Sequence, residues 1–194
     1  MHKLSPALSA LGLGLLAACG ASDGIERGPA PYGALVSSSE ALKVVFDEVC
    51  MPVVLDGADF VTTAKSRYMV SGQPAKDQTG QSSQTFRLAA FGGVTATLWP
   101  DGTCMVGLER GDSEELGQQA LASLATRGHV MKPGVSEPAP NDGARIAYCN
   151  QEPRPLILAL TKPASKSSKR PALVAGLYRA KGGASDICMR TSAG

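Results

Sequence analysis

Residues 94–108 read VTATLWPDGTCMVGL, and this stretch decides the fold. Residues 94–99 are rich in the β-branched and aromatic types that strands favour. The turn follows at Pro100-Asp101-Gly102, because proline presets φ, aspartate hydrogen-bonds to its own backbone and glycine takes up positive φ. Alternate residues beyond the turn share one face of the return strand: Cys104, Val106 and Leu108. The stretch therefore predicts a β-hairpin with one buried face.

Further strands are predicted on both sides of this hairpin. Phe86, Leu88 and Ala90 alternate with polar or small residues before it. Three apolar segments and a short C-terminal one are expected as later strands: 144–149, 156–161, 173–178 and 187–189. Residues 133–143 (PGVSEPAPNDG) are rich in proline and glycine and predict a loop.

The first helix is predicted over residues 37–51. Ser37 and Glu40 have the spacing of a capping box, in which two side chains satisfy backbone N–H groups of the first turn. Four apolar residues then recur on one helical face: Leu42, Val45, Phe46 and Val49. Pro52 is expected to end the helix, because proline lacks the N–H that the helix interior needs.

Two more helices are expected, over 59–69 and 112–127. The first would place Phe60, Ala64 and Tyr68 on one face. The second begins at Asp112 with Glu115 in capping-box spacing, ends before Gly128 and has four residues on its apolar face: Leu116, Ala120, Leu121 and Leu124. Both halves of the chain run from helix to strands, but no repeat is visible and we predict no duplication. The expected fold class is α+β: one small domain with an antiparallel sheet, two or more helices packed on it and two disulfides.

Composition limits the kinds of protein that this chain can be. It has 194 residues, 43% of them hydrophobic, and a formal net charge of +2. This length and apolar content suit one domain with a real core, which excludes full disorder and a multi-span membrane protein. A net charge this close to zero creates no large field for nucleic acid, so none is expected as a partner.

The N-terminus has the pattern of an export signal. Lys3 precedes an apolar run over 4–18, which is long enough for a signal-peptide core and short for a spanning helix. The run ends in Leu16-Ala17-Ala18-Cys19, a branched apolar residue and two small residues before a cysteine. This motif resembles the lipobox of bacterial lipoproteins.

In that family the cysteine sulfur receives a diacylglycerol, the chain is cut directly before it, and the new N-terminus is acylated, typically with palmitate. The resemblance implies a signal peptide at 1–18, a lipidated N-terminus and tether at 19–36 with Cys19 as the lipid attachment site, and a globular domain at 37–194. Gly20 replaces the aspartate that retains many such proteins at the inner membrane, so the resemblance favours the outer membrane, facing the periplasm. The alternative is an ordinary secretory signal cut near Ala18 or Ala21, and either way the protein leaves the cytoplasm.

The other four cysteines agree with export. An even number in an exported chain predicts two disulfides among Cys50, Cys104, Cys149 and Cys188. Three pairings are compatible with the sequence. We favour the two that stay within one half of the chain, Cys50–Cys104 and Cys149–Cys188; each would contribute on the order of 3–4 kcal/mol. Copper is the alternative, since three of these cysteines precede a methionine and soft sulfur ligands suit Cu(I).

Few residues suggest chemistry. His129 is the one histidine beyond the predicted signal, and its place after a helix favours a surface role over catalysis. Trp99 is interpreted as a core or hairpin-corner residue, with an aromatic binding platform as the alternative. The sequence also has an acidic cluster: Glu109, Asp112, Glu114 and Glu115. We interpret it as a solvated helix start, with a cation site or an acid pair as the alternative.

A basic loop is the remaining candidate contact. Residues 162–171 (KPASKSSKRP) join two predicted strands, and their cations would contact anionic partners such as phospholipid head groups or peptidoglycan carboxylates: Lys162, Lys166, Lys169 and Arg170. We favour a solubilising hairpin loop, and contact with an anionic partner is the alternative.

Without paired catalytic groups, the sequence favours a non-enzymatic role. The expected protein is a membrane-anchored lipoprotein that serves as a structural, accessory or binding module of the cell envelope. Its expected partners are the membrane, through the lipid, and other envelope proteins or peptidoglycan, with no cofactor and no metal. One alternative is an envelope enzyme or enzyme inhibitor with a site built from loops, which a pocket lined by Glu109, His129 or tyrosines would favour. The other alternative is a periplasmic copper-binding protein.

Overall fold

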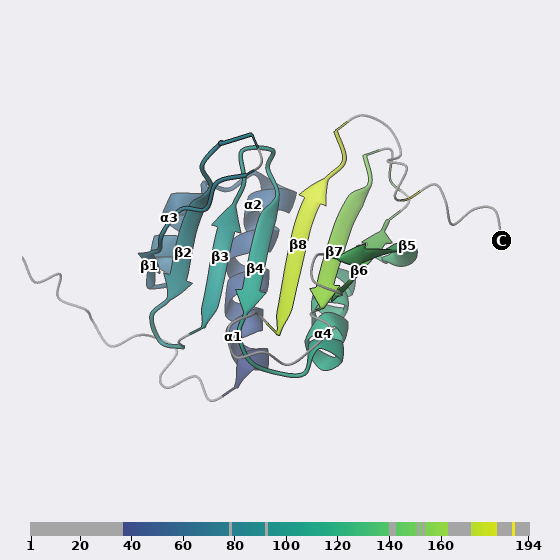
Figure 1. Cartoon of the computed structure of the whole chain (residues 1–194), viewed down its shortest axis with the longest axis horizontal. Helices are drawn as coiled ribbons and strands as arrows, with labels where there is room; N and C mark the ends of the chain where they lie inside the picture. Colours follow the sequence, from purple (N-terminus) through teal and green to yellow (C-terminus); the bar gives the residue numbers. More distant parts are fainter. Residues whose placement is uncertain are drawn as a thin grey trace, which may run out of the picture.

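A computed structural model of the chain describes residues 37–77, 79–91, 93–139, 143–150, 152, 154–162, 172–181 and 188. The predicted signal peptide, the predicted tether and Cys19 lie outside the described residues. Within the described part, one antiparallel sheet of eight strands has helices packed on one of its faces (Figure 1). The predicted α+β class, with a single small domain and two disulfides, is therefore confirmed.

The strands follow the spatial order β1-β2-β3-β4-β8-β7-β6-β5, and each neighbouring pair is antiparallel. The chain first runs as a meander from one edge of the sheet to its centre. After a helix it starts again at the other edge and returns, so the last strands of the two meanders pair in the middle. The strands are β1 (Met69–Ser71), β2 (Gln84–Leu88), β3 (Val94–Leu98), β4 (Cys104–Leu108), β5 (Lys132–Ala139), β6 (Gly143–Cys149), β7 (Leu156–Lys162) and β8 (Leu173–Arg179).

The helices precede the two meanders. They are α1 (Ser38–Val45), the π-helical turn η1 (Phe46–Cys50), α2 (Met51–Asp56), α3 (Phe60–Ser66) and, between the meanders, α4 (Ser113–Thr126). The capping box at the start of α1 is confirmed. Ser37 Oγ accepts a hydrogen bond from the Glu40 N–H at 3.1 Å, and the Glu40 carboxylate accepts one from the Ser37 N–H at 3.1 Å.

The prediction that Pro52 ends the first helix is wrong. The helix continues as α2 and ends at Gly57, whose φ is 71°. The π-helical turn is the reason, because its Met51 N–H bonds to the Phe46 carbonyl five residues back. Pro52 then falls in the first turn of the next α-helical segment, where a missing N–H is tolerated.

The main core lies between the helices and the sheet. The β4 face predicted from alternation is confirmed, since Cys104, Val106 and Leu108 are fully buried. Of the four residues predicted for the apolar face of α4, three are buried: Leu116, Ala120 and Leu124. The fourth, Leu121, is partly exposed and packs against the core. Phe86 and Leu88 of β2 are buried in the same core.

Three local predictions were wrong. The predicted loop over 133–143 contains most of β5, which accommodates Pro133 and Pro138 because it is an edge strand of the sheet. Tyr68 is 46% exposed with φ at 56°, since α3 ends at Ser66 and the chain turns away before reaching it. Of the predicted strand at 187–189 the structure describes only Cys188, and that residue is helical.

The disulfide pairing that we favoured is confirmed. Cys50 and Cys104 join η1 to β4 inside the main core, with their Cα atoms 5.4 Å apart. Cys149 and Cys188 are joined with their Cα atoms 5.8 Å apart. This second bridge belongs to a separate small apolar cluster that contains Ile157. Leu156 and Leu158, the neighbours of Ile157 in β7, belong to the main core, so Ile157 and its partner Cys149 lie on the sheet face away from the helices.

Candidate functional site: the open face of the sheet

The helices cover only one face of the sheet. Figure 1 shows α1, α2, α3 and α4 behind the sheet, and we call the opposite side the open face. Since Cys104, Val106 and Leu108 point into the helix-covered core, Met105 and Gly107 between them belong to the open face. The same alternation extends across the sheet through the registered pairs of β4, β8 and β7.

A hollow of about 350 Å³ lies in the open face. Its floor consists of small residues, Ala147, Ala159 and Gly176, from three neighbouring strands. A Cβ atom on Gly176 would meet the Met105 Cγ at 3.6 Å, which is ordinary van der Waals contact. The hollow therefore exists because the strands carry small side chains there, and Tyr178 and Met105 supply its larger walls.

Two neighbouring hollows adjoin this one. One, of about 270 Å³, is lined by Gly107 and Glu109, and the other, of about 310 Å³, by Asp77 and Trp99. Met105 lines all three hollows, so they meet at the centre of the open face. The open face is thus a continuous uneven surface and not a single enclosed pocket.

Trp99 lies at the rim of the open face, just beyond β3. Its indole N–H donates a hydrogen bond to the Met105 sulfur at 2.8 Å. The residue is partly exposed, which suits a position at the hairpin corner. Trp99 was interpreted as a core or corner residue, and the structure adds that it lines a hollow.

Charged groups surround Tyr178 in the main hollow. Burial raises the pKa of the Tyr178 hydroxyl; the nearby Arg145 charge lowers this pKa, and the carboxylates of Asp101 and Glu137 raise it. Arg145 lies opposite Glu137 in the register of β5 and β6, and its Nε donates to the Thr161 hydroxyl at 3.5 Å. The hollow therefore offers two carboxylates and one guanidinium around an aromatic hydroxyl.

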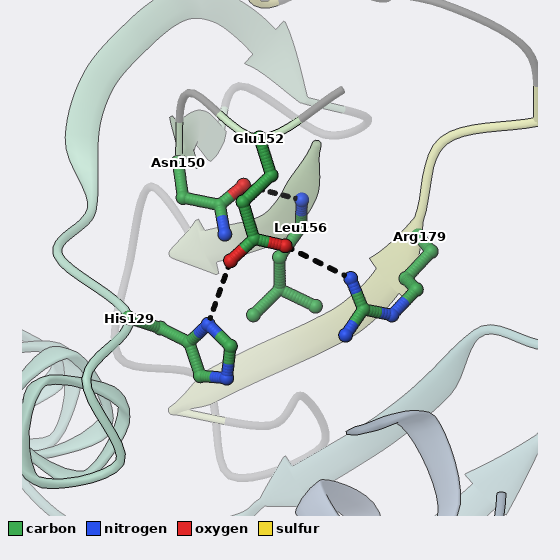
Figure 2. A network of polar contacts seen from close by, with 5 residues as sticks. All are labelled: His129, Asn150, Glu152, Leu156 and Arg179. Atoms are coloured by element: carbon green, nitrogen blue, oxygen red, sulfur yellow. Dashed lines mark hydrogen bonds and ion pairs between the residues drawn. The ribbon is translucent and has the colours of Figure 1, made fainter. Parts of the chain in front are cut away.

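His129 lies in a different part of the molecule. Its Nδ1 is 3.2 Å from the Glu152 carboxylate, and the other oxygen of Glu152 accepts a hydrogen bond from Arg179 at 3.2 Å (Figure 2). In the same region the Asn150 side chain accepts from the Leu156 N–H at 2.7 Å. The network links the end of α4 to the turn between β6 and β7 and to the end of β8. The His129 side chain is only 18% exposed, so the expected surface position holds only in part.

The helix that precedes His129 ends as the sequence predicted. Gly128 has φ at 82° and its N–H donates to the Ala125 carbonyl at 3.0 Å. The His129 N–H donates to the Leu124 carbonyl at 3.0 Å. These two bonds form a Schellman motif, which fixes the direction in which the chain leaves α4.

The acidic cluster does not form one site. Asp112 caps α4 by accepting hydrogen bonds from the N–H groups of Glu114 and Glu115 at 2.8 and 3.0 Å. Glu114 pairs with Lys162, and the hydrogen bond from Lys162 lowers the pKa of the Glu114 carboxyl. Glu109 instead lines a hollow of the open face. The interpretation as a helix start thus holds for the three residues at α4.

The basic loop is described only at its first residue. Lys162 is engaged with Glu114, so its charge is already paired. Lys166, Lys169 and Arg170 lie outside the described residues. In the described part of the chain, no group of three or more His, Cys, Asp or Glu side chains is arranged to hold a metal ion. Among the described helices, none has the length and apolar character needed to cross a membrane.

Sequence reasoning missed most residues of the open face. Met105 was considered only as a soft sulfur ligand for copper. Arg145, Glu137 and Tyr178 were not singled out, because they are far apart in the chain and form no motif. One signal was present: Gly107, Ala159 and Gly176 are small residues at alternate positions of apolar strands. Small residues on one strand face indicate a place where another group approaches closely. The chain matches no protein-family model, no curated protein and no solved structure.

Proposed function

We propose that this protein is a lipoprotein of the bacterial cell envelope whose domain is a non-enzymatic binding module, and that it engages its partner through the open face. The main hollow, with Tyr178 and Met105 as walls above a floor of small residues, is the observation that carries this proposal. A concave surface that combines apolar walls with a few polar groups is typical of a binding site.

The lipid anchor is supported by the lipobox-like motif that ends at Cys19. Each buried acyl CH₂ contributes about 0.8 kcal/mol to membrane binding, so two or three chains on one cysteine hold a protein stably. The two disulfides agree with the proposal, because they persist in oxidising compartments such as the periplasm. We place the anchor in the outer membrane, with the domain facing the periplasm.

Binding is favoured over the two alternatives by particular residues. Tyr178 lines the main hollow and Glu109 a neighbouring one, as an enzyme site would allow, but His129 is held by Glu152 in a separate network. A copper site would need thiolates, whereas the four described cysteines are paired in disulfides.

The lipid anchor is tested with Cys19→Ala. We expect this variant to appear in the soluble periplasmic fraction, because it has no sulfur to acylate, while Ser22→Ala stays with the membranes. The measurement is fractionation of cells followed by immunoblotting. Retention of Cys19→Ala in the membrane fraction would contradict a lipid anchor at this residue.

The binding surface is tested by photo-crosslinking in cells. A photoreactive residue at Thr103, which lines the main hollow, should give a defined adduct with an envelope component. One at Gln118, on the exposed side of α4, should not. The adduct at position 103 should disappear when Gly176→Val fills the hollow. Adducts from position 118 alone would place the binding surface elsewhere.

A further inference from the structure

We infer that the open face binds an extended basic segment of a partner protein, with a lysine or arginine side chain seated in the main hollow. The inference rests on the proposed function, since it names the chemistry of the ligand for the same surface. It is carried by the charges that line the three hollows and by the apolar groups between them.

Carboxylates predominate along the hollows. Four of them come from four separate segments of the chain: Asp77 from the loop before β2, Asp101 from the turn between β3 and β4, Glu109 from the end of β4, and Glu137 from β5. Arg145 is the one cation among the described residues that line them. The chain as a whole has a formal net charge of +2, so this acidic surface does not follow from its composition. A surface of this sign attracts a cationic partner and repels an anionic one.

The apolar groups of the open face suit the stems of basic side chains. Lysine and arginine carry three or four methylene groups that pack on apolar surface while the charged end reaches a carboxylate. Tyr178 and Met105 provide that surface inside the main hollow, and Trp99 provides it at the rim. A cation above an aromatic ring is attracted further by the negative face of the ring.

One positively charged residue, Arg145, also lines the main hollow. Arg145 lies opposite Glu137 and bonds to Thr161, so it neutralises part of the negative charge there. Arg87 of β2 lies opposite Thr95 and is exposed, outside the residues that line the hollows. Removal of the Arg145 charge should therefore strengthen binding of a cation, whereas removal of Asp101 or Glu137 should weaken it.

An extended segment fits the surface better than a single small amine. The three hollows adjoin at Met105, so a ligand that fills one is in contact with the next. In an extended peptide alternate side chains point the same way, about 6.5–7 Å apart. A peptide with a basic residue at every second position would thus present cations to successive acidic hollows.

The experiment uses the full chain, exported, oxidised and purified in detergent. The probes are the peptides Lys-Ala-Lys-Ala-Lys and Glu-Ala-Glu-Ala-Glu, titrated at low salt. Trp99 is the only tryptophan of the chain and borders the surface, so its fluorescence reports directly on occupancy. We expect the lysine peptide to bind with a fluorescence change that weakens as salt is added, and the glutamate peptide to give none.

Charge variants test the assignment of residues. Asp101→Asn and Glu137→Gln should each weaken binding of the lysine peptide about 3- to 10-fold, and Arg145→Gln should strengthen it by a similar factor. Glu115→Gln is the matched control, because it removes one carboxylate from the exposed start of α4 and should leave the affinity unchanged. Damage to the fold would weaken binding in all variants, so the opposite sign for Arg145→Gln is diagnostic.

Three outcomes would overturn the inference. If the lysine peptide does not bind, the ligand is not cationic. If it binds equally well to the double variant Asp101→Asn/Glu137→Gln, the cation is not seated in the main hollow. If the glutamate peptide binds instead, the charge that we assign to the ligand has the wrong sign, although the open face would still be a binding surface. Failure of the proposed function itself is recognised separately, by the absence of crosslinks from Thr103 in cells.

Discussion

Asp47 is a residue whose ionisation the fold opposes. It lies in η1, and burial raises the pKa of its carboxyl above the ordinary value of 3.8. A hydrogen bond with Ser123 of α4 and the charge of Lys43 lower this pKa in part. The folded protein therefore binds the Asp47 proton more tightly than the unfolded chain does. Ionisation of Asp47 above pH 3.8 consequently favours the unfolded state.

Asp47→Asn should remove this effect. At neutral pH only the wild type carries an ionised carboxyl at this partly buried position. The gain in stability of the variant over the wild type should therefore be larger at neutral pH than at a pH below 3.8. The measurement is urea denaturation of both proteins at the two pH values, compared as a difference in the free energy of unfolding.

Asp59→Asn provides a control of opposite sign. The Thr62 N–H hydrogen bond lowers the pKa of Asp59, so its charge stabilises the folded protein above pH 3.8 and that contribution is lost as the pH falls. This variant should therefore lose stability relative to the wild type as the pH rises. The same pH trend in both variants would refute the account of Asp47.

Among the elements, the ends of the helices can be predicted from neighbouring residues, whereas the edge strand of the sheet cannot. Ser37 and Asp112 cap α1 and α4 as their sequence spacing indicates, and Gly128 ends α4 in the left-handed conformation. These features depend on hydrogen bonds between residues a few positions apart. The edge strand β5 depends on a partner strand, so its proline-rich sequence could not reveal it.

Gly128→Ala should lower the free energy of unfolding by about 1 kcal/mol, because an alanine resists positive φ. Gly176→Ala is the control, since its φ is not positive and the added Cβ would make ordinary contacts. It should leave stability unchanged or raise it slightly. Thermal and urea unfolding measure both variants, and equal losses would show that left-handed φ is not the cause.

For the whole molecule, the two disulfides have different surroundings. Cys50 and Cys104 are both fully buried in the main core, where they join the first helical segment to the central strand β4. Cys188 is partly exposed, on the side of the sheet away from the helices. A thiol reductant must reach a sulfur atom to attack it, so the two bridges should differ in reactivity.

We expect a mild reductant under native conditions to open Cys149–Cys188 first, while Cys50–Cys104 is reduced only when the domain unfolds. Alkylation of free thiols followed by mass spectrometry identifies the opened bridge. The double variant Cys50→Ala/Cys104→Ala should lose about 4 kcal/mol of stability from loop closure alone, for a sequence separation of 54. Simultaneous reduction of both bridges in the folded protein would contradict the difference in burial.

The sequence by itself determined the helix starts, the hairpin at Pro100-Asp101-Gly102, the buried face of β4 and the α+β class. These follow from hydrogen bonds and side-chain periodicity within a few residues. The disulfide pairing was only favoured, since three pairings were compatible with the cysteine count. The tertiary structure selected one by bringing η1 against β4.

Only the tertiary structure decided the strand order, the passage of the first helix through Pro52 and the open face. Tyr178, Arg145 and Glu137 meet because β8, β6 and β5 are assembled in one sheet, and no local pattern encodes that meeting. The physical reason is the same in each case. Local interactions choose the conformation of a segment, whereas burial of apolar surface between distant segments chooses their neighbours.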